Sequence, residues 1–395
     1  MSTINSVSNS ESNFIIDSIR NLVIEFNRFV LNSDRVFIIG HKFPDADTIG
    51  SAVGFAQAAE LLIRNNFSEG NRVPVYIVVD NNADHVVQKL IRDKIATKDR
   101  KDLFPIRFIN EKALPKLNNN DFILITDVNQ TSRMIAGDKI STLPNRMIVD
   151  HHHTNSASMR DCYRFINTNM SSASEIVYRV LSLLRMSPTP EIATAILSGI
   201  YLDTNNYNQK SKMDYYPIVC DLESKYRADS SFVNKLLGIT FYEKVALDSV
   251  VTKNIEKYGG VLYKFSLSDA VAQGIVHDSK NNKKELVAAI VLNPEKSNRV
   301  FLSKLANSLV GLNVEDDLSI DIAITIGEIE DGTISVHGRS TGIIDIGKLF
   351  EKIGGGGIEM ARGSISNDSE RSLITKVKSL LPPTRDIPYK NSVVK

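Results

Sequence analysis

The sequence predicts an α/β fold built on a mainly parallel sheet, and three observations support this prediction. Short runs of almost continuously apolar residues alternate with segments of helical spacing in the first half of the chain. Strands that are covered on both faces are apolar in this way, and strands that alternate with helices form βαβ units. Acids and histidines follow several of these runs directly. In open α/β sheets such strand ends face the ligand crevice.

The first domain is predicted over residues 14–228. Apolar residues at helical spacing predict a helix over Phe14–Leu31. Further helices are predicted over Gly50–Ile63, Ser172–Leu184 and Pro190–Leu202, and we expect helices on both faces of the sheet. The predicted strands are Val36–Ile39, Val75–Val79, Ile106–Ile109, Phe122–Thr126 and Met147–Val149.

A helical, charged connector is predicted over residues 229–260, and a smaller α/β domain over residues 261–381. Its predicted strands are Val261–Ser266, Ala288–Leu292, Ile320–Glu328 and Thr333–His337. A part-strand, part-helix pattern covers Asn298–Val310, and a last helix covers Ser369–Leu381. Residues 1–13 are rich in Ser and Asn and are predicted to be a disordered tail. Residues 382–395 contain three prolines and are predicted to be a loosely held tail.

Composition narrows the class of protein. The 395 residues carry 47 basic and 46 acidic side chains, a net charge of +1. This balance argues against stable duplex nucleic acid as a partner, because such binding needs a clearly basic face. No apolar run approaches the ~18 residues of a membrane span, and the two cysteines suit a reducing compartment. We therefore expect a cytoplasmic protein without a membrane span, and a homodimer stays open.

Four clusters that contain acids follow apolar runs. So many anions cannot all ionise in one shared site without cations. Two divalent ions roughly 3.5–4 Å apart would balance them, generate a hydroxide and stabilise an in-line displacement. Ligation by carboxylate and imidazole without thiolate favours Mn²⁺, with Mg²⁺, Co²⁺ or Fe²⁺ also compatible. We therefore expect hydrolysis of a phosphoester at His41 with Asp45 and Asp47, Asp127, Asp150-His151-His152, and Asp203.

Each of these residues alone has a simpler interpretation. A single Asp after a strand, such as Asp127 or Asp203, is usually a cap or a turn residue. Capping does not require three histidines beside Asp150, however. The joint pattern therefore favours a metal site over a purely structural role.

A second group of residues could bind another part of the substrate. The run Gly354–Gly357 allows close approach of backbone N–H groups to an anion. Arg339-Ser340 ends a predicted strand and adds a permanent cation and a hydroxyl. We expect a second phosphate to bind at Arg339, Ser340, Gly355, Gly356 and Gly357.

The ordered motifs resemble those of the DHH phosphoesterase family, from about Phe14 to Leu381. The resemblance rests on His41-x-x-x-Asp45-x-Asp47 with Gly50-Ser51, then Asp127, Asp150-His151-His152 and Asp203. The C-terminal region is similar to the DHH-associated domain of that family. The resemblance implies that Asp150 supports or binds the metals and that His152 faces the scissile phosphate. It also implies two Mn²⁺ ions, with Asp47 and Asp127 as shared ligands, bound by His41, Asp45, Asp47, Asp127, His151 and Asp203.

Within the family, two stretches look most like the GdpP-type cyclic di-AMP phosphodiesterases: residues 40–50 and Ser171-Ser172-Ala173-Ser174-Glu175. Those proteins usually carry an N-terminal membrane region and sensor domains, so this sequence resembles their catalytic module standing alone. The resemblance implies opening of cyclic di-AMP to pApA, with further cleavage to AMP left open. The glycine loop of the family normally ends in His, whereas Ile358 stands here, which leaves substrate choice open.

Two alternatives to this function remain. One is a nanoRNase and pAp phosphatase of the NrnA type, which acts on short linear oligonucleotides. The other is a non-catalytic regulator that only binds nucleotides. Turnover of cyclic and linear substrates distinguishes the three.

Overall fold

The chain forms two compact units, Met1–Gly238 and Ile239–Lys395. This computed structural model describes residues 9–68, 73–80, 83, 85–96, 107–154, 158–204, 206–207, 214–238, 241–258, 261–276, 283–297, 299–315, 318–329, 332, 334–351, 360–362 and 370–387. The division falls inside the predicted connector. Helix α8 (Ser230–Leu237) belongs to the first unit, and α9 (Phe241–Tyr258) belongs to the second.

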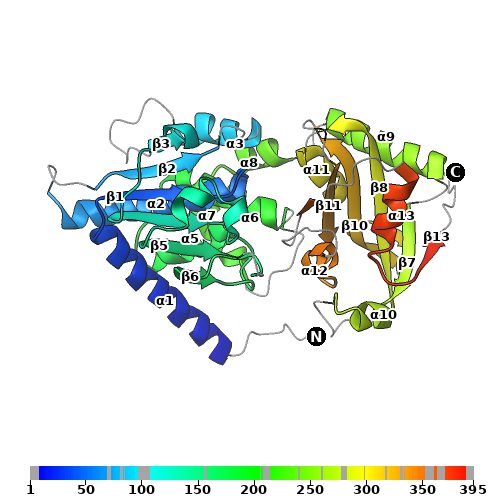
Figure 1. The fold of residues 1–395 in the computed structure, drawn as a ribbon, viewed down its shortest axis with the longest axis horizontal. Coiled ribbons are helices and arrows are strands. Elements are labelled where there is room, and N and C mark those ends of the chain that lie inside the picture. Colours follow the sequence, from blue (N-terminus) through cyan, green and yellow to red (C-terminus); the bar gives the residue numbers. More distant parts are fainter. Residues whose placement is uncertain are drawn as a thin grey trace. The chain divides into compact units, whose positions relative to one another are not determined.

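The first unit is built on a six-stranded sheet in which every neighbouring pair is parallel (Figure 1). The strand order is β3–β2–β1–β4–β5–β6. The predicted parallel sheet is confirmed, and its sixth strand lies outside the predicted set. The strands are β1 (Arg35–Ile39), β2 (Val75–Val79), β3 (Arg107–Asn110), β4 (Asp121–Thr126), β5 (Arg146–Asp150) and β6 (Tyr163–Ile166).

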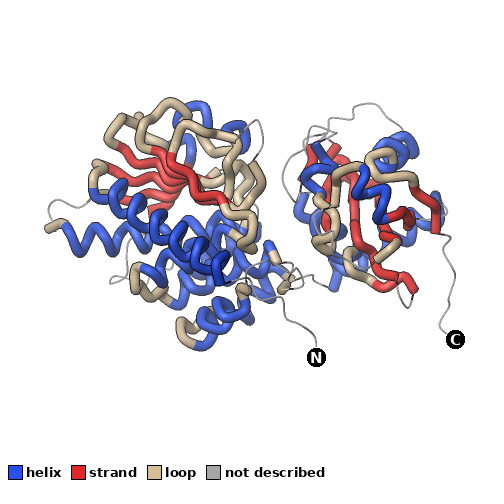
Figure 2. The backbone as a smooth tube through the Cα atoms, turned by 90° about the horizontal axis from the view of Figure 1, so that it is seen from below, coloured by secondary structure: helices blue, strands red, loops and turns tan. Residues whose placement is uncertain are grey.

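The helices of the first unit are shared unequally between the two faces of the sheet. Most of them gather on one face, as the tube view shows (Figure 2). On the other face, the described residues offer α4 (Gly137–Ile140) and short 3-10 turns, which cover the apolar side chains of β1, β4 and β5. The remaining helices are α1 (Asn9–Leu31), α2 (Ala46–Asn66), α3 (His85–Leu90), α5 (Ala173–Leu183), α6 (Pro190–Asp203) and α7 (Tyr216–Ser224).

The second unit is built on a mixed sheet in the order β12–β11–β10–β8–β7–β13, with β9 paired to β10. Strands β8 and β10 are parallel, and the other pairs are antiparallel. The strands are β7 (Leu262–Ser266), β8 (Glu285–Ser297), β9 (Asn313–Glu315), β10 (Leu318–Ile329), β11 (Ile334–Ser340), β12 (Met360–Arg362) and β13 (Thr384–Ile387). The helices besides α9 are α10 (Leu267–Ala272), α11 (Arg299–Leu309), α12 (Ile346–Glu351) and α13 (Glu370–Lys378).

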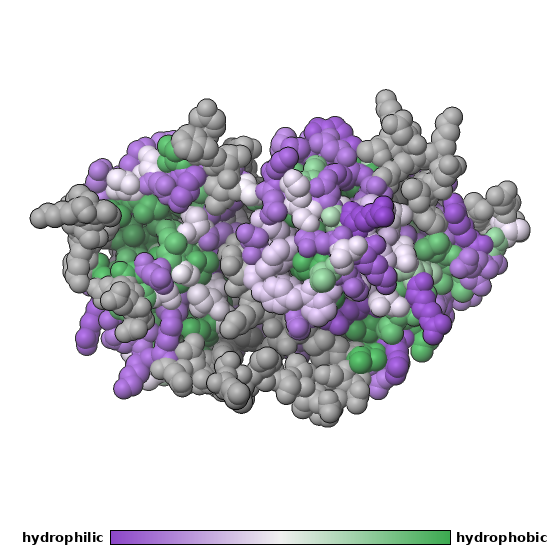
Figure 3. All heavy atoms as spheres, turned by 180° about the vertical axis from the view of Figure 1, so that it is seen from behind, coloured by the Kyte–Doolittle hydropathy of each residue, from purple (hydrophilic) through white to green (hydrophobic). Residues whose placement is uncertain are grey.

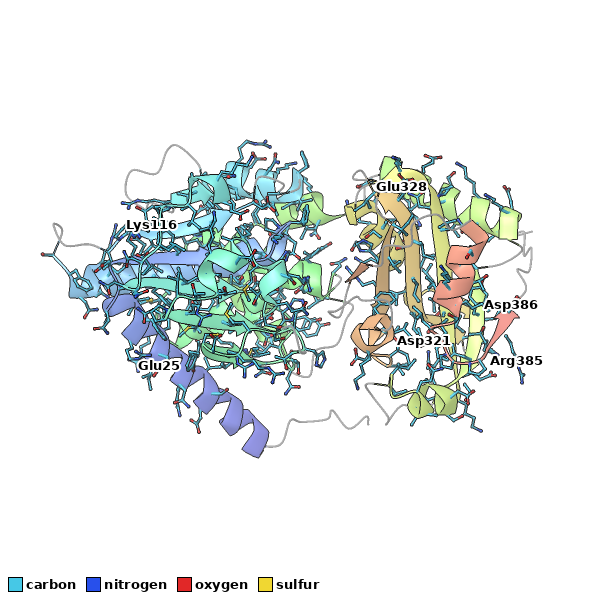
Figure 4. The ribbon with its side chains drawn as sticks, in the orientation of Figure 1. Glu25, Lys116, Asp321, Glu328, Arg385 and Asp386 are labelled. Carbon is cyan, nitrogen blue, oxygen red and sulfur yellow. The ribbon has the colours of Figure 1, made fainter. Side chains whose placement is uncertain are left out.

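One helix and one strand reach into the segments predicted as tails. Helix α1 begins at Asn9, inside the predicted disordered tail, because polar residues are compatible with a first helical turn, whose N–H groups have no partners within the helix. Strand β13 lies inside the predicted loose tail and pairs with β7, which satisfies backbone groups at that sheet edge. Arg385 and Asp386 project from β13 (Figure 4), so this strand lacks the apolar pattern that a sequence reading needs.

Two further observations concern the apolar character of the helices and of the surface. Among the described residues, no helix combines the length and the apolar character of a membrane span. On the face drawn in Figure 3, hydrophilic and hydrophobic residues are interspersed over both units.

Candidate metal centre

Three adjacent strands of the first sheet bring the predicted site residues to one edge. Strands β1, β4 and β5 are neighbours and parallel, so their carboxyl ends meet. His41 follows β1, Asp127 follows β4, and Asp150 ends β5. Helix α6 brings in the fourth cluster, because Asp203 is its last residue.

Asp127 lies at the centre of the cluster. Its Oδ2 lies 3.4 Å from His41 Nε2, and its Oδ1 lies 3.6 Å from both His151 Nε2 and His152 Nδ1. The residue is 2% exposed and has a φ of 61°. A left-handed backbone at a residue other than glycine costs free energy and is commonest at functional sites. The distances show that the two carboxylate oxygens of Asp127 face two different sets of candidate ligands.

The first set lies where β1 leads into α2. Asp45 Oδ2 lies 3.5 Å from His41 Nε2, while Asp45 Oδ1 caps α2 by accepting from Asp47 N and Thr48 N. His41 Nδ1 lies 2.8 Å from the Lys42 carbonyl oxygen. Because a carbonyl only accepts, Nδ1 carries a hydrogen, and Nε2, which faces Asp45 and Asp127, is the atom that could bind a metal when the ring is neutral.

The second set surrounds His151. Its Nε2 lies 3.1 Å from Asp203 Oδ2 and 3.8 Å from Asp47 Oδ2. Within the part of the chain that the structure describes, His151 Nε2 and Asp127 Oδ1 are buried, and no neighbouring group reaches either atom with the geometry of a hydrogen bond. Buried polar atoms without a partner are rare and call for an explanation such as an ion.

The residues present fit a site for metal ions. Three groups of acids and histidines have ligand atoms within 4.8 Å of one another, and Asp127 belongs to all three. Ligands that share one ion at about 2.1 Å can lie up to about 4 Å apart, so the measured separations are compatible with shared ions. The groups are His41 with Asp45 and Asp127; Asp47 with Asp127, His151 and Asp203; and Asp127 with Asp150, His151 and His152.

The carboxylates and imidazoles of the cluster shift one another's pKa values. Burial lowers the pKa of His41 and His151, but the close approach of Asp127 and a second acid outweighs it, so both pKa values lie well above the usual range. Burial, together with the charge of Asp127, raises the pKa of Asp47 to about 7. Burial would also raise the pKa of Asp127, but His151 and His41 hold it well below its usual range. Metal ions must displace these protons, so binding should weaken as the pH falls.

Asp47 is held by the N-terminus of α5. The backbone N–H groups of Ala173 and Ser174 each donate to one Asp47 oxygen at 2.8 Å, and Ser172 caps the helix. An anion is stabilised at this end of a helix. Gly199 on α6 lies so close that an added Cβ would be 2.6 Å from Asp47 Oδ1. Packing of α6 therefore also fixes the position of this carboxylate.

Asp150 is occupied by protein donors and orients the histidines. Its Oδ1 accepts from the backbone of His151 at 2.8 Å and lies 2.8 Å from His152 Nδ1. Its Oδ2 accepts from Asn129 Nδ2 at 2.6 Å, and Ser158 Oγ donates to Asn129 Oδ1 at 2.6 Å. The His152 side chain keeps 18% of its surface exposed, so it is the accessible end of this chain of hydrogen bonds.

Residues 35–200 match the description "DHH family, N-terminal domain". This span contains every candidate ligand except Asp203, which lies three residues beyond it. Residues 35–200 are thus a domain of the DHH family.

Two relatives show how far the similarity within the DHH family extends. Cyclic-di-AMP phosphodiesterase GdpP of Bacillus subtilis is 25% identical over 334 residues, which cover 83% of this chain and 44% of that protein. The chain thus spans less than half the length of this relative. The bifunctional oligoribonuclease and PAP phosphatase NrnA of Mycoplasma pneumoniae is 24% identical over 354 residues, which cover 87% of this chain and 91% of that protein.

One solved structure supports the fold. An exopolyphosphatase-related protein from Bacteroides fragilis superposes with a TM-score of 0.59 at 18% identity. The likeness covers 91% of this chain and 95% of that chain. At this identity it shows the fold alone.

Three residues support the candidate metal centre in roles that the sequence patterns do not indicate. Thr48 Oγ1 donates to Asp127 Oδ2 at 2.6 Å, Asn129 holds Asp150, and Ser174 offers its backbone N–H to Asp47. Thr48 and Asn129 each lie within two residues of a candidate ligand. A search for hydrogen-bonding residues beside the predicted ligands would therefore have found these two, whereas the contact of Ser174 depends on folding.

Replacing Asn129 by Leu should lower kcat/KM of the metal-dependent reaction by about 10- to 100-fold, since outer partners of metal ligands contribute about this much. The change keeps the shape but removes the donor that holds Asp150 Oδ2. Steady-state kinetics at saturating Mn²⁺ measure the loss. Asn145→Leu is the matched control, because Asn145 lies beyond the other end of β5 and bonds to Asn119. Equal losses in both variants would contradict the orienting role.

The residues predicted to bind a second phosphate lie in the second unit. Arg339 on β11 is 7% exposed, and its guanidinium donates to Asn307 Oδ1 at 2.5 Å and to Ser303 Oγ at 2.7 Å, both on α11. Ser340 Oγ donates to the Ile344 carbonyl oxygen at 2.7 Å. Gly355, Gly356, Gly357 and Ile358 lie outside the described residues. That these residues bind a second phosphate of the substrate stays a prediction.

We expect the buried His337 to make the stability of the second unit depend on pH. Burial, with a smaller contribution from Arg339, lowers its pKa to about 3. Between pH 3 and 6.5 the unfolded chain then binds more protons at this residue, so stability falls as the pH falls through that window. From pH 6.5 to 4.5 the loss should be about 2–3 kcal/mol.

This pH effect can be measured by hydrogen exchange of β11 peptides in a urea series. The loss between pH 6.5 and 4.5 should be smaller in His337→Asn than in the parent chain. His85→Asn, at an exposed position, should keep the parent slope. Identical pH slopes for the parent and His337→Asn would contradict the assignment.

Proposed function

We propose that this chain is a Mn²⁺-dependent phosphodiesterase that opens cyclic di-AMP to pApA, with further cleavage to AMP as a second step. The observation that carries the proposal is the position of Asp127, whose two oxygens face two separate sets of carboxylate and imidazole ligands. That arrangement supports two ions that share one carboxylate. The donor set of oxygen and nitrogen without sulfur favours Mn²⁺.

Each group of the site has a part in this proposal. When bound, a pair of divalent ions supplies a nucleophile at neutral pH and neutralises charge on the phosphate. The residues that would hold them are His41, Asp45, Asp47, Asp127, His151 and Asp203. His152, held at Nδ1 by Asp150 and partly exposed, would contact the scissile phosphate.

The cyclic substrate is supported by the relatives. The B. subtilis relative is described as a cyclic di-AMP phosphodiesterase, and the similarity covers 83% of this chain. The NrnA relative favours a second candidate, an oligoribonuclease and pAp phosphatase, because the match covers 91% of that protein. Both candidates use the same cluster and differ in substrate.

The test is turnover of cyclic di-AMP, pApA and pAp by the full chain with Mn²⁺, with Asp127→Asn as the control. Cleavage of cyclic di-AMP that is lost in the control supports the proposal. Cleavage of only pApA or pAp assigns the chain to the NrnA type. Nucleotide binding without turnover in Mn²⁺ would leave the non-catalytic regulator as the remaining function.

A further inference from the structure

An exposed aromatic residue lies on the loop that carries His41 and Asp45. Phe43 is 40% exposed and stands two residues from both His41 and Asp45. Its φ is 57°, in the left-handed region, and it precedes Pro44, although a residue before proline favours an extended backbone. Exposure of a large apolar ring and a left-handed backbone both cost free energy.

The backbone around Phe43 is held on two sides. The Lys42 N–H donates to the Arg133 carbonyl oxygen at 2.7 Å, and Lys42 Nζ donates to the Ser132 carbonyl oxygen at 2.9 Å. The Phe43 N–H points to Asp80 Oδ2 at 3.4 Å, just after β2. Pro44 is buried. The loop thus holds the backbone of Phe43 in place between two candidate ligands, His41 and Asp45.

We propose that Phe43 stacks on a nucleobase of the substrate and makes this site select nucleotides over phosphoesters that lack a base. The inference rests on the proposed function, because ions at Asp127 would hold a phosphate and leave the attached nucleoside beside the loop. Every base has a π face, so an exposed ring can bind it without reading its sequence. A phenyl ring also loses little conformational freedom on binding.

A tyrosine cluster near Asp203 is the competing platform. Tyr216 is 57% exposed, and its ring stacks on Tyr215 at 4.7 Å between centroids. Its hydroxyl donates to the Tyr207 carbonyl oxygen at 3.1 Å. Phe43 lies two residues from both His41 and Asp45, closer in the chain to its neighbouring ligands than Tyr216 is to Asp203. The observations favour Phe43.

The sequence contains no tryptophan, so Phe43→Trp introduces a single tryptophan whose emission can be followed. AMP with Mn²⁺ should quench its emission, whereas ribose 5-phosphate, which carries a phosphate but no base, should not. Ile24→Trp on α1, where Ile24 is 61% exposed, is the control and should respond to neither compound. Tyr216→Trp reports on the competing platform.

Kinetics provide the second readout. Phe43→Leu removes the ring but keeps apolar bulk, and KM for pApA or cyclic di-AMP should rise about 5- to 100-fold, the range expected for one stacked base. The value of kcat should change much less, because the ring makes no contact with the reacting atoms. Phe43→Tyr keeps an aromatic ring, so its KM should stay close to that of the parent chain.

The outcomes separate this inference from the proposed function. Mn²⁺-dependent turnover with no quenching in Phe43→Trp and an unchanged KM in Phe43→Leu would overturn the stacking role and leave the function standing. Quenching by AMP without turnover of any substrate would support stacking and overturn the phosphodiesterase. Quenching in Tyr216→Trp alone would assign the base to the tyrosine cluster and overturn the role of Phe43.

Discussion

Replacing Asp127 by Asn should lower Mn²⁺-dependent phosphodiester cleavage by about 10³-fold, because a divalent ion contributes several kcal/mol of charge stabilisation. Asparagine keeps the shape of the side chain but removes the charge that faces both sets of ligands. One oxygen can still accept from Thr48. The loss should therefore reflect metal binding rather than unfolding.

The number of ions bound by the Asp127→Asn variant is the sharper measurement. Titration with Mn²⁺, followed by its electron paramagnetic resonance signal, should show two sites in the parent chain and weakened binding at both sites in the variant. The variant should also lower the pKa values of His41 and His151, since Asp127 is a cause that raises both. Histidine NMR titration without metal reads this second effect.

Asp138→Asn is the matched control, because Asp138 is an exposed acid on α4 outside the cluster. It should keep the parent turnover and two sites. Two tight sites and near-parent turnover in Asp127→Asn would exclude a shared carboxylate at this position. The cluster would then have to bind its ions through separate ligands.

Strands with two buried faces were predictable from the sequence, whereas two of the edge strands were not. Strands β1, β2 and β4 are nearly continuous apolar runs because side chains on both faces are covered. Strand β6 (Tyr163–Ile166) and strand β13 both lie at sheet edges, with partly exposed side chains. Their residues lack a pattern that distinguishes them from loops.

The meeting of the candidate ligands was predictable from the sequence. They follow parallel strands, and the carboxyl ends of neighbouring parallel strands lie side by side whatever the loops do. The contacts that position them were not. Asp47 receives its hydrogen bonds from Ala173 and Ser174, 126 and 127 residues away in the chain. These partners depend on how α2, α5 and α6 pack, which no local pattern encodes.

Replacing Gly199 by Ala should destabilise the first unit by about 1–3 kcal/mol, the usual cost of overpacking a core. Helix propensity alone predicts the opposite sign, because alanine is favoured over glycine within a helix. The added Cβ would lie 2.1 Å from Ser174 Oγ and 2.8 Å from Asp47 Cα. Either helix α6 or the candidate ligand Asp47 must therefore move. Displacing Asp47 should weaken Mn²⁺ binding by about 10- to 100-fold.

Gly54→Ala separates crowding in general from displacement of Asp47. Gly54 lies on α2, and there an added Cβ would meet the side chain of Val177 at 2.9 Å and no candidate ligand. Urea unfolding should show destabilisation in Gly199→Ala, and Mn²⁺ titration should show weakened binding in that variant alone. If Gly199→Ala were more stable than the parent and bound Mn²⁺ equally well, α6 would have room to shift without moving Asp47. The position of that carboxylate would then depend on the N-terminus of α5 rather than on the close packing of α6.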